Sequence, residues 1–238
     1  MKNSNFKLFA VVSFLFTLIS IHSFAQENFK NFSVNNVKSV SVSSGINLII
    51  RQQGNENLKV EGPRNLLSRL EVINEGGHLT IRFKQNTSWN WNFNDKGLNA
   101  YLNIKNLNSI KASGGSDVIS YGILNFPSLK VAASGGADVE LNVRANNLLL
   151  NASGGADIKL KGVTRNMEAN ASGGSDIDAK HLIAQFAKAS ASGGADITLN
   201  VVKALNASAS GGGDIAYIGD PQVTKNNSRS GDVTRIRD

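Results

Sequence analysis

Aspartate recurs at one fixed position of a repeated heptapeptide, and this series of carboxylates is the first feature of the sequence that could carry out chemistry. The motif reads Ala-Ser-Gly-Gly-x-Asp-Val/Ile; six copies are nearly identical, and a seventh, at Ser230 to Val233, is shortened. We call the repeated carboxylates the Asp ladder: Asp117, Asp138, Asp157, Asp176, Asp196, Asp214 and Asp232. Carboxylates stacked about 5 Å apart repel by roughly 0.8 kcal/mol per neighbour in water, so another interaction must offset this repulsion.

Two interactions are candidates for that role. The first is turn chemistry, in which Asp accepts hydrogen bonds from turn N–H groups, glycine supplies positive φ and serine hydroxyls bridge neighbouring repeats. The second is Ca²⁺, which binds carboxylate oxygens. Calcium-binding Gly-Gly-x-Gly-x-Asp solenoids repeat about every nine residues, whereas this motif lacks one of their glycines and repeats every 18 to 21 residues. We therefore expect a structural turn ladder and predict no metal site.

A second candidate site is the segment in which Trp89, Trp91 and Phe93 alternate with asparagine. On a β-strand this alternation places the three rings on one face and the amides on the other. The rings either pack across the N-terminal end of the fold or form an exposed platform on which sugar rings or a partner protein stack. Packing is the simpler interpretation, and these three residues are the candidate ligand-binding residues of the chain.

Residues for catalysis are sparse. The chain has no cysteine, and past the first 25 residues its histidines are His78 and His181, which lie far apart in sequence. Glu140 and Asp178 each follow a motif aspartate by two residues, so they point outward on one face, and Arg144 and Arg165 lie in variable links. These are more typical of solvated charges than of an acid–base pair. We predict no catalytic residue, no cofactor and a protein that is not an enzyme.

The repeat predicts the elements that position these residues. A period near 20 residues is typical of a solenoid, in which each coil buries its apolar face only by stacking on its neighbours. Before and after each motif the apolar residues alternate, as in Leu148/Leu150/Ala152 and Ile158/Leu160. Each coil is therefore two strands joined by a tight glycine turn, with alanine beside the turn because the facing strands converge there. The predicted fold is an all-β parallel β-helix of two facing sheets, with about 20 residues per coil.

The organisation of the chain follows from this pattern. Residues 1–25 combine a basic start, an apolar run and Ser-Phe-Ala, as in a signal peptide. We expect residues 26–238 to form a single solenoid domain, with irregular N-terminal coils and a cap at 26–105 and regular coils at 106–238. Within the irregular part, a short helix should follow Pro63, and Leu70–Phe83 should form a hairpin around Gly76-Gly77. Phe186 is out of register with the interior and should point outward or mark a bulge.

Composition narrows the classes of partner. The formal charge is +7, but lysine and arginine are scattered along the chain, which argues against a nucleic-acid interface. The absence of cysteine excludes disulfides and a lipid anchor on cysteine. The apolar run from Leu8 to Ile21 is too short to span a bilayer, and no second run of that length follows, so the exported protein should have no transmembrane segment.

The Ser44-Gly45-Ile46-Asn47 segment followed by serial Ser-Gly-Gly-x-Asp turns resembles a family of exported bacterial proteins, mostly from Bacteroidetes. This is the putative auto-transporter adhesin, head GIN domain family, whose name matches the Gly45-Ile46-Asn47 triplet. The likeness runs from about Val37 to Ile218. It implies a parallel β-helix related in shape to pectin lyases but without their catalytic residues, and a role in adhesion.

Together these features predict a rigid binding module at the cell surface or in the periplasm. Its outward positions carry Ser, Asn, Lys, Thr and Glu, which suits a glycan or an envelope protein. An envelope sensor or accessory protein is the alternative function, and a polysaccharide-active enzyme is the third. A second copy of the chain is a further candidate partner.

Overall fold

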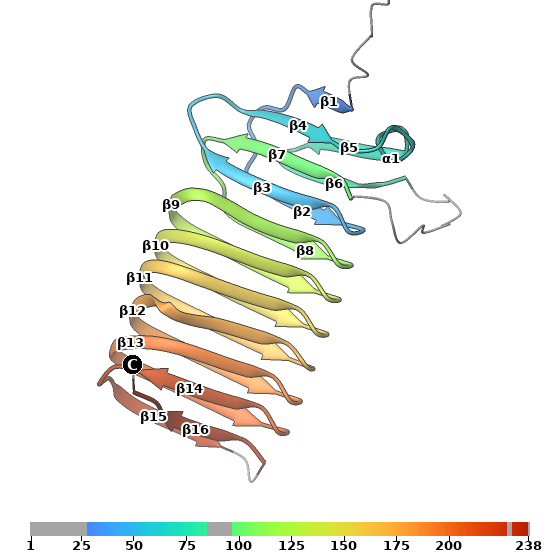
Figure 1. Ribbon diagram of the computed structural model, residues 1–238. Helices are drawn as coiled ribbons and strands as arrows, with labels where there is room; N and C mark the ends of the chain where they lie inside the picture. Colours follow the sequence, from blue (N-terminus) through green and yellow to red (C-terminus); the bar gives the residue numbers. More distant parts are fainter. Residues whose placement is uncertain (1–27, 85–96, 228–229, 238) are drawn as a thin grey trace, which may run out of the picture.

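The chain winds into a β-solenoid of about seven turns of roughly 19 residues each (Figure 1), as the repeat predicts. A computed structural model describes residues 28–84, 97–227 and 230–237. Each regular coil is one long strand that starts at a ladder Asp, bends half-way and ends at the next motif Ser. The five long strands are β9 (Asp117–Ser134), β10 (Asp138–Ser153), β11 (Asp157–Ser172), β12 (Asp176–Ser192) and β13 (Asp196–Ser210).

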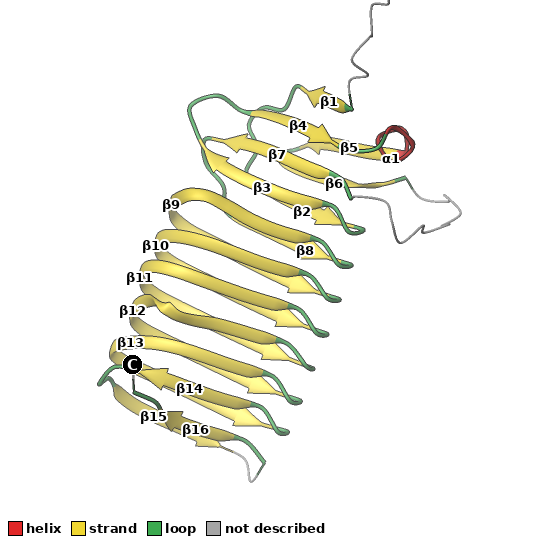
Figure 2. Cartoon of the chain, in the orientation of Figure 1, coloured by secondary structure: helices red, strands yellow, loops and turns green. Residues whose placement is uncertain are grey.

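Shorter elements complete the two ends of the solenoid (Figure 2). The N-terminal elements are β1 (Phe29–Phe32), β2 (Ser39–Ser43), β3 (Asn47–Gln52), β4 (Asn57–Glu61), α1 (Arg64–Arg69), β5 (Leu70–Glu75), β6 (His78–Phe83), β7 (Asn99–Ile104) and β8 (Ser109–Ser113). The C-terminal strands are β14 (Asp214–Ile218), β15 (Gln222–Asn227) and β16 (Asp232–Arg235). The helix after Pro63 and the antiparallel β5–β6 hairpin confirm the expectations for this part of the chain.

The strands form two facing layers. The Asp face follows the glycine turns and runs β1-β4-β7-β3, then the first halves of β9 to β13, then β14 and β16. The Ser face precedes the turns and runs β5-β6-β2-β8, then the second halves of β9 to β13, then β15. The layers meet at two edges: the glycine edge, made of the Gly-Gly turns, and the bend edge, where β9 to β13 bend at residues 121–127, 142–146, 161–165, 180–185 and 200–203.

The interior confirms the predicted alternation. Leu148, Leu150 and Ala152 on β10 are all buried, as are Ile158 and Leu160 on β11. Alanines stack in register beside the glycine edge, with Ala133, Ala152, Ala171 and Ala191 pairing from coil to coil. On the Ser face of the regular coils, the interior position beside the glycine edge is thus always alanine, as the predicted wedge requires, whereas Val or Ile is buried at the facing position after each ladder Asp.

Each glycine turn hydrogen-bonds to the next. The N–H of Gly115 donates to the carbonyl of Gly135 at 3.2 Å, and the N–H of Gly135 donates to the carbonyl of Ser153 at 3.3 Å. Both glycines of most turns have φ between about 60° and 81°, a region that L-residues with a side chain rarely occupy. The small residue that follows them, such as Ser116 or Ala137, is fully buried inside the turn.

The Ser44-Gly45 segment forms one more turn of this kind. Ser44 and Gly45 both have φ of 70°, and Gly45 N–H donates to the Gly114 carbonyl at 3.0 Å. Ile46 lies buried above Ser116, whose hydroxyl accepts a hydrogen bond from the Ile46 N–H at 3.2 Å. Gly45-Ile46-Asn47 is thus the first turn of the stack, with Ile46 in place of the usual small residue.

The first coil, however, is not the outermost one. Strand β3 lies between β7 and β9, and β2 lies between β6 and β8, with all four pairings parallel. After β3 the chain therefore forms an outer layer that includes β6 and β7, and β8 then pairs with the other side of β2. Antiparallel β4 and β1 cover the Asp face of this outer layer, so the N-terminal end departs from the purely parallel coil.

Phe186 is exposed and lies beside a register shift, as its position in the sequence predicts. Its ring is 39% exposed, and the pairing of β12 with β13 shifts register between Ala184 and Phe186. A similar shift in β9 between Ile119 and Ile123 places Tyr121 and Gly122 in a bulge. Extra residues are thus absorbed near the bend edge, which keeps the glycine turns in line.

Candidate functional site

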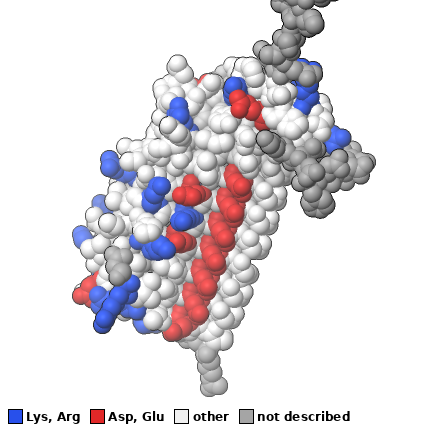
Figure 3. All heavy atoms as spheres, in the orientation of Figure 1, with Lys and Arg blue, Asp and Glu red and all other residues white. Residues whose placement is uncertain are grey.

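The Asp ladder is an exposed stripe along the glycine edge (Figure 3). Every ladder residue pairs in register with the next, from Asp117 to Asp232. On the N-terminal side the row continues as Asn47 and Asn99, whose side-chain amides hydrogen-bond at 3.1 Å. The carboxylate repulsion therefore ends where asparagine replaces aspartate.

Asp157, near the middle of the ladder, is affected by its neighbouring carboxylates. The pKa of Asp157 is raised, first by partial desolvation and then by the neighbouring charges of Asp176 and Asp138, while a backbone N–H of Asp176 donates to Asp157 and opposes the rise. At the C-terminal end the pKa of Asp232 is lowered, mainly because its carboxylate accepts hydrogen bonds from Thr234 and from the Val233 N–H at 2.7 and 2.8 Å. The charged form of Asp157 is thus disfavoured by desolvation and by its two neighbours, whereas that of Asp232 is favoured by its turn contacts.

Among residues 28–84, 97–227 and 230–237, no group of three or more His, Cys, Asp or Glu side chains has the arrangement of a metal site. The structural role of the ladder remains a prediction that stability measurements can test.

Asp157→Asn should raise the unfolding free energy at pH 7 by less than about 1 kcal/mol, because an exposed charge pair is screened by solvent. Since the folded pKa is raised, the carboxylate destabilises the fold once pH exceeds the unfolded pKa of about 3.9, and the gain from Asn should vanish at pH 3. Urea unfolding of both proteins at pH 7 and pH 3 measures this difference in unfolding free energy.

The matched control is Asp232→Asn, for which the sign reverses. Because the pKa of Asp232 is lowered in the fold, its carboxylate stabilises at pH 7 and loses that contribution as pH falls through the folded pKa. The series is run in EDTA and repeated with Ca²⁺. A Ca²⁺-dependent gain that disappears in Asp157→Asn would contradict the metal-free account.

The residues considered for catalysis do not converge. His78 lies on the Ser face, where its Nδ1 and Nε2 contact the hydroxyls of Ser39 and Ser41 at 2.7 and 3.2 Å. His181 lies at the bend edge. Glu140 and Asp178 share one outward row of the Asp face, as predicted, but Lys159 stands between them.

Arg144 and Arg165 are exposed at the bend edge. Asp178 pairs with Lys180 at 3.4 Å. The predicted ligand-binding residues Trp89, Trp91 and Phe93 lie outside the described residues.

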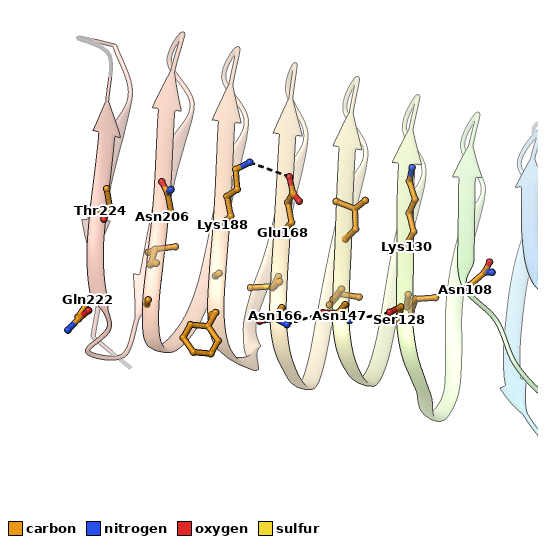
Figure 4. Close-up of a pocket in the computed structure, with 18 residues that line it drawn as sticks. Asn108, Ser128, Lys130, Asn147, Asn166, Glu168, Lys188, Asn206, Gln222 and Thr224 are labelled. Carbon is orange, nitrogen blue, oxygen red and sulfur yellow. Dashed lines mark hydrogen bonds and ion pairs between the residues drawn. The ribbon is translucent and has the colours of Figure 1, made fainter.

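A shallow groove of about 640 Å³ runs along the solenoid axis on the Ser face (Figure 4). Two outward rows form its walls, and the strand backbones between them form its floor. It is lined by Asn108, Ser128, Leu129, Lys130, Asn147, Leu148, Leu149, Asn166, Met167, Glu168, Phe186, Ala187, Lys188, Ala204, Leu205, Asn206, Gln222 and Thr224.

Hydrogen bonds order one wall of this axial groove. Asn147 Nδ2 donates to Ser128 Oγ at 3.3 Å, and Asn166 Nδ2 donates to Asn147 Oδ1 at 2.9 Å. Phe186 occupies the next position of the same row, so an aromatic ring ends the amide series. Because each amide has more donor and acceptor capacity than these bonds use, the wall retains polar groups for a ligand.

The opposite wall carries charge. Lys130, Leu149, Glu168, Lys188 and Asn206 follow one another in register, and Lys188 Nζ lies 3.7 Å from Glu168 Oε1. The groove was not predicted from the sequence. Ser128, Asn147 and Asn166 recur at a spacing of 19 residues, and this period could have indicated that their side chains line up along the solenoid.

A comparison with family models matches residues 36–221 to the family described as putative auto-transporter adhesin, head GIN domain. The chain belongs to this family. The resemblance inferred from the motifs is therefore confirmed. The family match spans the first glycine turn, the Asp ladder from Asp117 to Asp214 and most of the axial groove.

Crystal structures share the head GIN domain fold. One, described as a putative adhesin from Bacteroides fragilis, is 23% identical with a TM-score of 0.80. A putative adhesin from Parabacteroides distasonis is 20% identical with a TM-score of 0.70, and a putative lipid binding protein from the same species is 19% identical with a TM-score of 0.67. Each comparison covers 87% of this chain and 96% of the other. No curated protein matches.

The triplet in the family's name has a defined place in this chain. Gly45, Ile46 and Asn47 form the first glycine turn, where Ile46 fills the turn and Asn47 replaces the ladder Asp. In the part of the head GIN domain that the structure describes, no helix is long and apolar enough to cross a membrane.

Proposed function

We propose that this protein is an exported, non-catalytic adhesion-type module whose axial groove binds an extended glycan. The groove itself carries the proposal, because it offers an ordered amide wall, an exposed aromatic ring and a length of several coils. The predicted signal peptide at residues 1–25 and membership of an adhesin family support export to the cell surface or periplasm.

A glycan suits this groove better than an extended peptide does. Coils stack about 4.8 Å apart, whereas an extended peptide rises about 3.3 Å per residue, so its side chains would fall out of step with the rows. Sugar rings present hydroxyls around an apolar ring face. Amides such as Asn147 and Asn166 match the hydroxyls, and Phe186 matches the ring face.

An envelope protein is the competing ligand, either for adhesion or within a sensor or accessory role. A folded partner would cover a wide area of the Ser face rather than the groove alone, since stable interfaces bury about 800 Å² on each side. The scattered catalytic candidates give no support to a polysaccharide-active enzyme.

Phe186→Ala should weaken glycan affinity about tenfold, because the stacked ring contributes roughly 0.5–1.5 kcal/mol beyond the area it covers. A glycan array with the purified protein identifies the ligand, and calorimetry measures the affinity. Asn166→Ala should also weaken binding, through the loss of an ordered amide.

Asn170→Ala is the matched control. Asn170 donates to Asn151 at 3.2 Å in the same way that Asn166 donates to Asn147, but neither Asn151 nor Asn170 lines the groove. Equal losses in Asn166→Ala and Asn170→Ala would indicate a general loss of structure. An array without any bound glycan, or binding unchanged in Phe186→Ala, would exclude the groove as a glycan site.

A further inference from the structure

Large apolar side chains are exposed near the bend edge on four of the five long strands, and we call this set the apolar row. Ile123, Val163, Ile183 and Val202 come from four of the five long strands and are between 43% and 53% exposed. Val163 and Ile183 are direct neighbours in register. Tyr101 and Ile119 are exposed as well, but they lie beside the N-terminal end of the Asp ladder, away from the bend edge.

Basic side chains surround this row. Arg144 precedes Val163 in the same register row, and Lys161, Arg165 and Lys203 flank it on the same coils. Two acids lie close to these residues, and both are paired: Asp178 with Lys180 at 3.4 Å, and Asp220, which follows Gly219 beside Val201, with Arg235 at 3.0 Å. Figure 3 shows Lys and Arg gathered toward the bend edge and the acidic stripe near the glycine edge. Charge is therefore segregated across the width of the solenoid.

The coils stack in register, so the bend edge is a nearly straight line along the solenoid axis (Figure 1). Aliphatic and basic side chains from successive coils can therefore reach a flat surface at the same time. The Asp ladder lies at the opposite edge and would face away from such a surface.

We infer that the bend edge docks on an anionic lipid bilayer, with Val163, Ile183 and Val202 entering the headgroup region and Arg144, Lys161 and Arg165 contacting lipid phosphates. Basic residues close to an anionic membrane each contribute about fivefold in affinity, and exposed apolar rows rimmed by polar groups typically mark interaction sites.

Other partners fit this edge less well. A soluble polyanion would use the basic residues but leave the aliphatic row in water. A second copy of the chain offers its Asp ladder as the complementary charge, but the large apolar side chains exposed beside that ladder, Tyr101 and Ile119, lie only at its N-terminal end and cannot cover the coils of Val163 to Val202.

Vesicle flotation tests the inference. The purified protein is mixed with vesicles of phosphatidylcholine alone or of an equal mixture with phosphatidylglycerol. We expect flotation only with the anionic vesicles, and release by high salt.

Two triple variants separate the contributions. Arg144→Ala, Lys161→Ala and Arg165→Ala together should weaken partitioning roughly a hundredfold, and Val163→Ser, Ile183→Ser and Val202→Ser together should weaken it at least about tenfold. The control, Arg64→Ala, Arg69→Ala and Lys111→Ala, removes as many charges from α1 and the Ser face and should change partitioning only a few-fold. Urea unfolding checks that every variant folds.

Several outcomes would overturn the inference. One is the absence of flotation with anionic vesicles, and another is an equal loss in the control. Unchanged partitioning in the serine variant, or competition by soluble polyphosphate, would indicate a polyanion site. Concentration-dependent dimers in sedimentation velocity that disappear in the serine variant, without vesicle binding, would assign the edge to a second copy.

Discussion

Gly162→Ala should lower the free energy of unfolding by about 4 kcal/mol, although it adds only one methyl group. Gly162 has φ of +124°, and a Cβ at this position would lie 2.0 Å from the Val143 carbonyl oxygen of the preceding coil. A left-handed conformation costs a residue with a side chain roughly 1–2 kcal/mol, and overpacking typically costs about 1–3 kcal/mol. Urea unfolding monitored by circular dichroism measures the sum.

Gly122→Ala is the control for the backbone contribution alone. Gly122 has φ of +84° and also lies near the bend edge, but no atom lies within 4 Å of the position its Cβ would take. It should therefore lose only about 1–2 kcal/mol. Equal losses for the two substitutions would mean that the backbones at Gly162 and Val143 are farther apart than described, and that coil stacking is not close at this point.

The difference between these two glycines also shows what can be predicted from the sequence. The Gly-Gly turns, the buried alternation and the alanines beside the turns were all predictable, because a period-2 pattern decides which side chains face the core. Gly162 and Gly122 fall in links of variable length, where no pattern repeats. Their environments depend on which backbone atoms of the neighbouring coil come close.

Stacking order was the main feature of the fold that could not be predicted. Alternation in β3 and β7 indicates that Leu48 and Ala100 face inward, but it does not say which strand stacks on β9. Residues that are distant in sequence decide this, through the hydrogen bonds of Gly45 to Gly114 and of Ile46 to Ser116. Ile46 makes the first turn hard to recognise in the sequence, because the six Ser-Gly-Gly-x-Asp turns all hold a small residue at that position.

The binding surfaces were harder to predict than the core, since they form between coils. The Asn147–Asn166 hydrogen bond joins residues 19 positions apart, and the apolar row at the bend edge depends on bulges such as the one near Phe186. Because bulges shift register, a constant period does not align these residues. The Asp ladder was visible in sequence because its turns do not vary in length.

Ala171→Leu should lower the free energy of unfolding by about 3 kcal/mol, which is the second large effect. Ala171 is buried beside the glycine edge and stacks between Ala152 and Ala191. Three additional carbons at this position must push the two layers apart, and the hydrogen-bonded turns on either side oppose that movement. Overpacking of a closed core typically costs about 1–3 kcal/mol, and a position clamped by stacked turns should lie at the upper end. Urea unfolding measures the loss.

Met167→Leu is the matched control, because it places the same side chain at an interior position of the same strand on the wide side of the wedge. Met167 is equally buried, and it stacks between Leu148 and Ala187. A Met-to-Leu exchange nearly conserves volume, so its cost should stay below about 1.5 kcal/mol. If both substitutions cost the same, the interior does not narrow toward the glycine edge. The alanines would then need another cause, such as strand propensity, and the close approach of the two layers would no longer explain why the turns stay aligned.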